Sequence, residues 1–255
     1  MAVRAGQMVP PGQLDDCNCA RSRPKRGMIQ DHVLFIDGEA IVLDKPAGLP
    51  VDPPRDGSIS LENHLGNLTF GFQRWPTPVH RLDRDTSGCL LLARNPKAHA
   101  RFQQAFEAGA VTKRYLAVID GIPDAPSGMI DLALIKVSSA ERGWRMTGSP
   151  NGKSARTRWR MLAQKDGRAF IAFYPETGRT HQIRVHAAEG LGFPITGDPV
   201  YGVANGRKLM LHAAQLTVPR PGKPDIHAEA PIPDAFRAFG FAGGQPQDEL
   251  GDDAG

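Results

Sequence analysis

Residues 79–93 of the chain read VHRLDRDTSGCLLLA, a dense polar stretch followed at once by an apolar run. Four ionised side chains fall within the five residues from Arg81 to Asp85. The apolar run at 89–93 is typical of a buried strand. The polar residues are therefore expected at the edge of a core. Two interpretations fit them: a solvated turn, or a carboxylate held ionised among guanidinium groups for chemistry or for RNA contact.

Composition restricts the class of protein. The 255 residues are 40% hydrophobic and 23% charged, as in a soluble globular protein with one large domain or two sub-domains. No apolar run is long enough for a membrane span, and the N-terminus has no apolar segment of the kind found in signal peptides. The three cysteines do not form a disulfide framework. We therefore expect a cytoplasmic protein without a membrane partner.

The charge is distributed unevenly along the chain. The formal net charge is +4, and residues 136–184 hold eleven Lys or Arg against three Asp or Glu. Residues 244–255 hold four acidic residues and no basic ones. The folded part is thus more basic than the total indicates, which favours a nucleic-acid substrate.

Residue patterns divide the chain into three parts. Residues 1–27 are predicted to be a disordered basic tail, 28–242 a folded domain, and 243–255 an acidic disordered tail. In the domain we expect a hairpin, short helices and further strands. A helix should begin at Asn95 and end at Gly109, and another should be capped by Thr180. The expected hairpin strands are 33–36 and 40–43, a short helix is expected at 61–68, and further strands at 89–93, 111–119, 129–136 and 153–174 and from residue 208.

Several basic and aromatic side chains are candidates for substrate contact. Lys45 lies in a Pro- and Gly-rich loop, where phosphate contact and plain surface exposure are equally compatible with the sequence. Arg156, Arg158 and Arg160 alternate along a strand and so share one face. Because like charges on one face repel, RNA contact and a solvated face have equal weight for this row. From spacing alone, Tyr115 is a half-buried strand tyrosine beside a basic neighbour.

The motifs that are missing exclude several enzyme classes and leave a reaction that uses one carboxylate. The sequence has no G-x-S-x-G, no Walker-type loop, no G-x-G-x-x-G after a strand and no zinc-ligand spacing. We therefore expect no metal and no cofactor. Asp83 and Asp85 form a poor glycosidase pair, because Arg84 lies between them and neither resembles a general acid of raised pKa. A single ionised Asp, used as nucleophile or base among arginines, fits better.

Six blocks in order resemble those of the RluA-type pseudouridine synthases. The resemblance runs from about Val33 to Phe236 and implies that residues 28–242 are a pseudouridine synthase catalytic domain. The signature block of the family is matched by HRLDRDTSG at 80–88. The others are LDKPAGLPV at 43–51, KRYLA at 113–117, TGRTHQIRVH at 177–186, GDPVYG at 197–202 and LMLHA at 209–213.

The resemblance implies a role for individual residues. Asp83 would attack the target uridine, at the sugar or at the base ring. Tyr115 would stack on the flipped base, and Arg184 would pair with Asp83 and keep it ionised. Arg81 would enter the space that the base has left, because chemistry on a stacked base requires extruding it. Ile183 would line the uracil pocket.

The resemblance also implies the fold and the substrate class. The fold would be α+β, with a long mixed, mainly antiparallel sheet, flanking helices and a central active-site cleft. The 27 residues before the domain are too few for an S4 domain, so the catalytic domain itself would recognise a tRNA or a 23S-type rRNA stem-loop, as a monomer. Two rivals remain: an RNA-binding protein without activity, and a glycoside enzyme using Asp83 and Asp85. Within the signature, His80 is expected to be structural, and Arg84, Asp85 and Thr86 to shape the loop.

Overall fold

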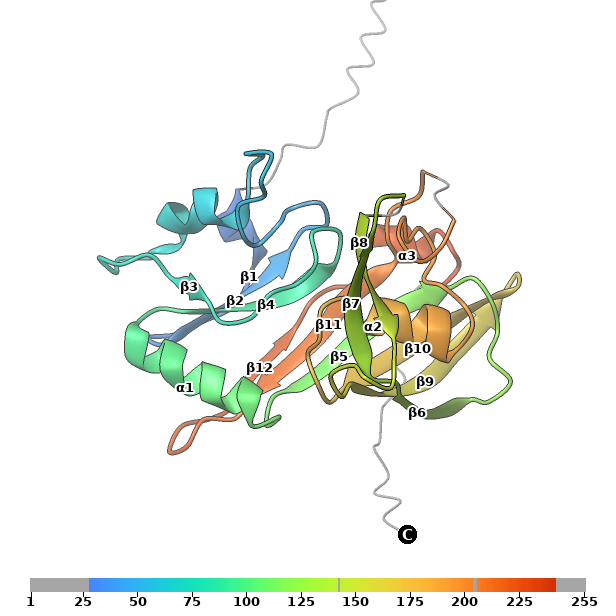
Figure 1. Cartoon of the computed structure of the whole chain (residues 1–255). Helices are drawn as coiled ribbons and strands as arrows, with labels where there is room; N and C mark the ends of the chain where they lie inside the picture. The colour runs from blue at the N-terminus through green and yellow to red at the C-terminus, as the bar shows by residue number, and fades with distance from the viewer. Residues whose placement is uncertain (1–27, 142, 204–205, 242–255) are drawn as a thin grey trace, which may run out of the picture.

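The computed structural model describes residues 28–141, 143–203 and 206–241, so the predictions for both tails and for Cys17 and Cys19 lie outside the described residues. Within the described residues, ten strands form one sheet (Figure 1). Its main path is β1-β2-β4-β11-β5-β10-β9-β6; β12 pairs with β11 and β3 with β4. The strands of this sheet are β1 (Val33–Ile36), β2 (Ala40–Lys45), β3 (Thr77–Pro78), β4 (Ser87–Ala93), β5 (Thr112–Ile119), β6 (Ser127–Asp131), β9 (Arg156–Lys165), β10 (Arg168–Pro175), β11 (Leu211–Val218) and β12 (Ile226–Glu229).

The sheet is mixed and mainly antiparallel, as predicted. Among the described strands, β4 and β11 form the one parallel pair, and the other neighbours are antiparallel. The expected hairpin is present as β1 and β2. Because β11 lies between β4 and β5, the late strand of the chain joins the N-terminal and C-terminal halves of the sheet (Figure 1).

The N-terminal half is covered on both faces, which explains the continuous apolar runs of β2 and β4. Ile41 and Leu90 face a cluster formed with the 3-10 helices η1 (Ile29–His32) and η2 (Leu61–Leu68). Val42 and Leu91 face the opposite cluster, with α1 (Pro96–Glu107). The helix α1 begins as predicted, since the Asn95 side chain accepts a hydrogen bond from the Ala98 backbone N–H at 2.9 Å.

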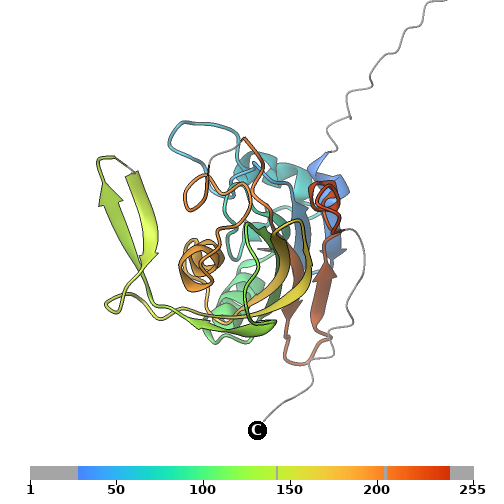
Figure 2. The same ribbon diagram turned by 90° about the vertical axis from the view of Figure 1, so that its right-hand side faces the viewer.

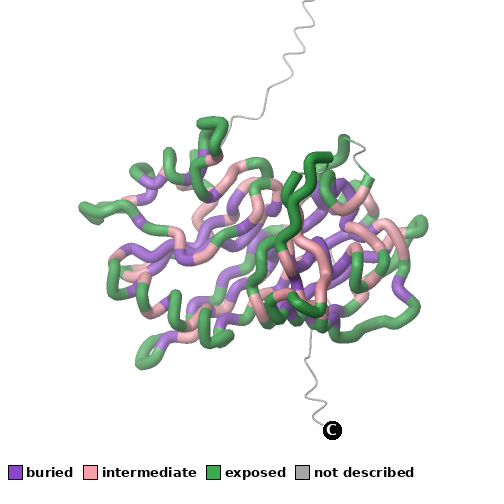
Figure 3. Tube along the Cα trace, in the orientation of Figure 1, coloured by how far each residue is buried: buried purple, intermediate pink, exposed green. Residues whose placement is uncertain are grey.

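The C-terminal half carries helices on opposite faces of the sheet (Figure 2). α2 (Gln182–Val185) continues into one π-helical turn, η3 (His186–Gly190), and α3 (Asp234–Arg237) packs Phe236 on Phe170. Strand β7 (Leu134–Ser139) pairs with β8 (Gly143–Gly148) in a separate two-stranded sheet. This hairpin, called the β7–β8 hairpin below, projects from the body of the molecule; β7 is mostly exposed and β8 is mostly half-buried, whereas buried residues follow the main sheet (Figures 2 and 3).

Gly88 allows β4 to approach β11 closely. Its φ is +106°, and a Cβ at this position would lie 2.2 Å from the carbonyl oxygen of Ala213, the residue paired with it in β11. A side chain here would therefore require both an unfavourable backbone conformation and a shift of the neighbouring strand.

We expect Gly88→Ala to lower the free energy of unfolding by about 3 kcal/mol or more, since strain and overlap act together. Gly71→Ala is the matched control, because Gly71 also has a positive φ, +84°, but an added Cβ there would have no neighbouring atom within 4 Å. That control should lose roughly 1 kcal/mol. Urea denaturation of both variants measures the difference, and equal losses would contradict the assigned overlap.

A buried histidine links the same two strands. His212 of β11 is fully buried, and its Nδ1 lies 2.8 Å from the Ser87 hydroxyl of β4. Burial lowers the pKa of His212 to about 4, partly opposed by the carbonyl of Ala230. The imidazole is therefore neutral in the folded protein near pH 7.

This lowered pKa predicts a loss of stability in acid. Between pH 6.5 and 4 an unfolded His212 binds a proton that the folded protein does not bind, so stability falls as the pH falls through this window. The contribution should reach roughly 3 kcal/mol at about pH 4. The free energy of unfolding of His212→Asn should depend less steeply on pH over this range than that of the parent. Parallel curves for the two proteins would refute the assignment.

Candidate active site

A groove of about 590 Å³ crosses the middle of the sheet. One wall comes from the end of α1, through Phe106 and Glu107, and the other from the loop 176–179 and α2. The floor contains Tyr115 and Leu211 of the central strands, and the signature residues 79–83 run along it. The predicted central cleft is therefore present, and the signature residues 79–83 line it.

Asp83 lies at the start of a tight turn within this groove. Its carbonyl accepts a hydrogen bond from the Thr86 backbone N–H at 3.1 Å, which closes the turn formed by Arg84 and Asp85. The Asp83 side chain remains 26% exposed and so is accessible from the groove. The loop-shaping part predicted for residues 84–86 agrees with this geometry.

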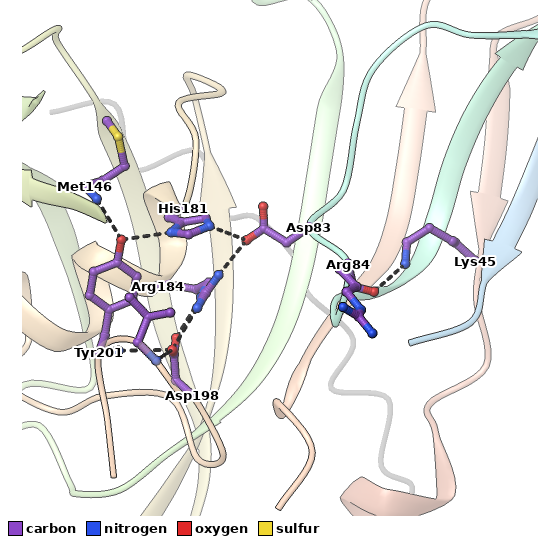
Figure 4. A network of polar contacts seen from close by, with 9 residues as sticks. Lys45, Asp83, Arg84, Met146, His181, Arg184, Asp198 and Tyr201 are labelled. Carbon is purple, nitrogen blue, oxygen red and sulfur yellow. Dashed lines mark hydrogen bonds and ion pairs between the residues drawn. The ribbon is translucent and has the colours of Figure 1, made fainter. Parts of the chain in front are cut away.

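The buried side chain of Lys45 holds this turn in place. The Lys45 ammonium is fully buried and donates hydrogen bonds to the carbonyls of Pro46, Leu49 and Arg84 at 2.8–3.0 Å. Figure 4 shows the contact with Arg84. Burial lowers its pKa to about 8, although the nearby carboxylates, Asp85 foremost, act in the opposite direction. The suggested phosphate contact by Lys45 is therefore wrong, since three carbonyls enclose its amine; the side chain joins the early loop to the signature loop.

Arg184 connects Asp83 to a second carboxylate. Its Nη1 donates to Asp83 Oδ2 at 3.1 Å, across 101 residues of sequence. Its Nε and Nη2 donate to the two oxygens of Asp198 at 2.7 and 2.8 Å, a bidentate pair (Figure 4). Asp198 is fully buried and also accepts from the backbone N–H groups of Val200 and Tyr201. Asp198 thus fixes the orientation of the guanidinium, so that its Nη1–H group points at Asp83.

The charge of Arg184 and the charges of Asp198 and Asp83 are of opposite sign and stabilise each other. Burial opposes the positive charge of Arg184, but the hydrogen bonds and charge of Asp198, and then of Asp83, outweigh it and raise the Arg184 pKa. Burial likewise opposes ionisation of Asp198, yet the hydrogen bonds from Arg184 hold the pKa of Asp198 below its usual range. Arg184 therefore presents a permanent cation to Asp83.

The remaining residues implied by the resemblance line the same groove. Tyr115 and Lys113 point into it from β5, on the shared face that their spacing predicts. Burial, and secondly the Asp83 charge, raises the pKa of Tyr115, so its hydroxyl stays protonated near neutral pH. Ile183 lines the groove from α2, with 7% exposure. Arg81 lies at the mouth, where its exposed guanidinium is 2.8 Å from the Asp52 carboxylate.

His80 has a structural position, in agreement with the prediction for it. Its ring stacks on Phe106 with 4.7 Å between centroids, and its Nε2 accepts a hydrogen bond from the Leu91 backbone N–H at 3.0 Å. Burial lowers the pKa of His80 to about 3, so the ring is neutral and able to accept this bond. The side chain fastens the signature loop to β4 and α1.

The start of α2 differs from the prediction. Thr180 does not cap the helix; the turn before it contains His181 in the left-handed conformation, with φ +53°. Gln182 organises this turn, because its side-chain oxygen accepts from the Arg179 N–H and its amide donates to the Thr157 hydroxyl at 3.0 Å. A capping pattern in the sequence cannot distinguish this arrangement from an ordinary helix start. It places Arg184 and Ile183 over the groove.

The arginine row on β9 lies outside the groove. Trp159 and Phe173 are paired on the face of the sheet that carries Tyr115, so Arg156, Arg158 and Arg160 point to the opposite face. Carboxylates also lie beside two of them: Asp131 and Glu176 within 3.6 Å of Arg156, and Glu176 within 3.5 Å of Arg158. These carboxylates reduce the repulsion between Arg156 and Arg158 that favoured a phosphate partner. RNA contact by the row stays a prediction for RNA that extends past the cleft.

Sequence reasoning did not assign the partners that hold Arg184. Asp198 lies in the quoted block GDPVYG, but nothing local distinguishes an Asp in a Gly- and Pro-rich turn from a solvated one. Tyr201 and His181 also went unassigned; His181 Nε2 lies 3.8 Å from Asp83 Oδ2. The sequence does place Asp198 and Tyr201 in one turn. That spacing identifies them as partners of Arg184 and His181 only when the fold shows that the turn lies against α2.

Two findings concern other classes of site. Among residues 28–141, 143–203 and 206–241, no three His, Cys, Asp or Glu side chains gather in a way that would hold a metal ion. No helix in the part of the chain that the structure describes is long and apolar enough to cross a membrane.

The groove brings an aspartate turn, a fixed arginine and a strand tyrosine together on a mixed sheet, as an enzyme that uses a single carboxylate requires. The family model for RNA pseudouridylate synthase matches residues 39–189, and the chain belongs to this family. It is an RNA pseudouridine synthase, an isomerase of RNA uridine.

Two curated relatives and one solved structure agree with the family. The chain is 57% identical over 217 residues to an uncharacterised RNA pseudouridine synthase of Zymomonas mobilis, covering 84% of this chain and 99% of the relative. It is 34% identical to ribosomal large subunit pseudouridine synthase D of the same organism, covering 82% and 73%. The solved structure of human RNA pseudouridylate synthase domain containing 4 shares the fold, with a TM-score of 0.69, 24% identity and coverage of 83% and 94%.

Proposed function

We propose that Asp83 is the nucleophile with which this enzyme converts uridine to pseudouridine in structured RNA. The supporting observation is the 3.1 Å contact between Asp83 and Arg184 at the centre of the groove. In the reaction the bond from ribose C1′ to N1 breaks and a bond from C1′ to C5 forms, while a proton leaves C5 and N1 gains one. A carboxylate adding to the sugar or to the base ring permits this exchange.

The other groove residues would hold the flipped uridine. Tyr115 would stack on the uracil ring from the floor, and Ile183 would cover it from α2. Arg184 would stay hydrogen-bonded to Asp83 and keep its carboxylate oriented through the approach of the base. Arg81, exposed at the mouth, would fill the space that the base leaves in the RNA. The pair with Asp52 would have to open for this movement.

We further propose a tRNA or 23S-type rRNA stem-loop as substrate, with the enzyme acting as a cytoplasmic monomer. The relative named ribosomal large subunit pseudouridine synthase D supports ribosomal RNA as one possibility for the target. The excess of basic residues between 136 and 184 supports a polyanionic partner of considerable size.

Pseudouridine mapping with and without the gene tests the substrate. At least one uridine in a stem-loop should lose its modification in the deletion strain and regain it on complementation. The purified protein should then modify a transcript of that stem-loop. If no position changes and no transcript is modified, the proposed substrate class is wrong. Loss of signal in an unstructured region alone would contradict the stem-loop.

A further inference from the structure

The β7–β8 hairpin stands off the body of the protein but touches the site at one place. The backbone N–H of Met146 in β8 donates to the Tyr201 hydroxyl at 3.0 Å. Trp144 of the same strand stacks on the ring of His181, with 5.1 Å between centroids and 29° between planes. Both body residues belong to the walls that surround Arg184 (Figure 4).

A second set of contacts joins the hairpin to η3. The Thr147 hydroxyl donates to Glu189 Oε1 at 2.9 Å, and the Gly148 N–H donates to Oε2 at 2.7 Å. Met146 and Tyr201 also pack beside the small apolar cluster of Leu134, Ala155 and Val185 at the hairpin base. The hairpin position and the Tyr201 position are therefore mechanically connected.

From Tyr201 the contacts continue to the proposed nucleophile. The Tyr201 hydroxyl lies 2.9 Å from His181 Nδ1, and His181 Nε2 lies 3.8 Å from Asp83 Oδ2 (Figure 4). The Tyr201 ring also lies under the Arg184 guanidinium, 5.2 Å from its Cζ. Two residues thus separate the hairpin backbone from the carboxylate.

The hydrogen positions in this chain of contacts follow from counting donors. The Tyr201 hydroxyl accepts from Met146, so its own hydrogen needs an acceptor, and His181 Nδ1 is the described atom that lies in hydrogen-bond reach. The proton of a neutral His181 then resides on Nε2, where it faces the Asp83 carboxylate. The other tautomer would direct a lone pair at that carboxylate and leave the hydroxyl hydrogen without this acceptor. Burial lowers the pKa of His181, which agrees with a neutral ring.

We infer that Tyr201 and His181 are positioning residues that transmit the place of the β7–β8 hairpin to the carboxylate of Asp83. When the hairpin is docked, the Met146 N–H orients the Tyr201 hydroxyl, which holds His181 with an N–H toward Asp83. When the hairpin moves away, the hydroxyl loses its donor and Trp144 leaves the imidazole. The rotation of the imidazole and its tautomer then become free, and Asp83 loses a neighbour that limits its orientation. This inference rests on the proposed role of Asp83.

The first test needs no RNA. Nitrogen-15 NMR of histidine in the parent protein should show His181 as the Nε2–H tautomer, with Nδ1 unprotonated. In Tyr201→Phe the His181 signals should shift toward a mixture of tautomers, whereas Tyr174→Phe, the matched control on β10 outside the groove lining, should leave them unchanged. An unchanged tautomer in Tyr201→Phe overturns the inference whether or not the proposed function holds.

The second test separates positioning from RNA binding. Tyr201→Phe and Trp144→Ala should lower kcat for pseudouridine formation roughly tenfold or more with KM within about twofold, since a small misplacement of a reacting group acts on turnover. Trp144→Phe should restore most of the rate by keeping a ring over His181. Trp75→Ala removes another exposed tryptophan and should leave kcat unchanged.

The outcomes divide clearly. Trp144 is half exposed, so its variants keep the inference testable even if Tyr201→Phe does not fold. A raised KM with intact kcat for Trp144→Ala would mean that the hairpin only grips RNA, and the inference would fail. A lowered kcat that Trp144→Phe does not restore would also count against it. If the parent protein forms no pseudouridine at all, the proposed function fails, and the NMR result still decides the coupling.

Discussion

Asp83→Asn should reduce pseudouridine formation by roughly 10⁴-fold or more, because the amide has the shape of the carboxylate but no nucleophilic charge. RNA binding should remain, since the basic residues outside the groove are unchanged. Single-turnover release of tritium from C5 of labelled uridine measures the rate, and filter binding measures affinity. Product formation at the parent rate would exclude Asp83 as the nucleophile.

Asp85→Asn is the matched control for this experiment. Asp85 belongs to the same turn and is half buried. Its loss should change turnover only a few-fold through the shape of the loop. Equal, large losses from both substitutions would revive a mechanism that uses two carboxylates. The comparison therefore distinguishes the isomerase mechanism from the glycosidase alternative.

Arg184→Met should both destabilise the protein and stop turnover. The substitution leaves Asp198 buried without its bidentate partner, and losing one member of a buried ion pair costs about 3–5 kcal/mol. It also removes the cation beside Asp83, so the variant should be inactive at temperatures where it is still folded. Urea denaturation and single-turnover assays on the same sample measure the two effects.

A double variant separates stability from catalysis. Arg184→Met with Asp198→Asn removes the buried charge, so most of the lost stability should return while turnover stays absent. Arg220→Met is a matched control, because Arg220 is a buried arginine that pairs with Asp37 far from the groove. It should lose stability and keep its kcat when folded. Recovery of turnover in the double variant would show that Arg184 acts only through stability.

The sequence predicts best those features that depend on neighbours along the chain. The polar turn before β4, the cap of α1 at Asn95 and the shared face of Lys113 and Tyr115 follow from local spacing. The contact between Arg184 and Asp83 does not follow from spacing, since 101 residues separate them. It was expected only through resemblance to a known family. Local patterns cannot supply such a pair because the fold alone brings the two segments together.

The features that escaped prediction depend on burial. Lys45 was a candidate for phosphate contact because lysine in a loop is normally exposed, but three carbonyls enclose its amine. Asp198 received no role because an Asp in a Gly- and Pro-rich turn is normally solvated, yet its side chain is fully buried against Arg184 of α2. The β7–β8 hairpin was not predicted: the strand expected at 129–136 spans the end of β6 and the start of β7, and β8 lies outside the expected strands, since alternation does not reveal that a pair leaves the main sheet.

The position of β11 between β4 and β5 has a consequence for folding of the chain during its synthesis. β4 and β5 are neighbours in the chain but not in the sheet, and residues 211–218 must be inserted between them. Contacts of such long sequence separation form slowly and only when the late segment is available. The turn that carries Asp83 and the strand that carries Tyr115 therefore cannot reach their final spacing on the ribosome until β11 has emerged. A nascent chain that lacks residues 211–218 therefore has no competent site.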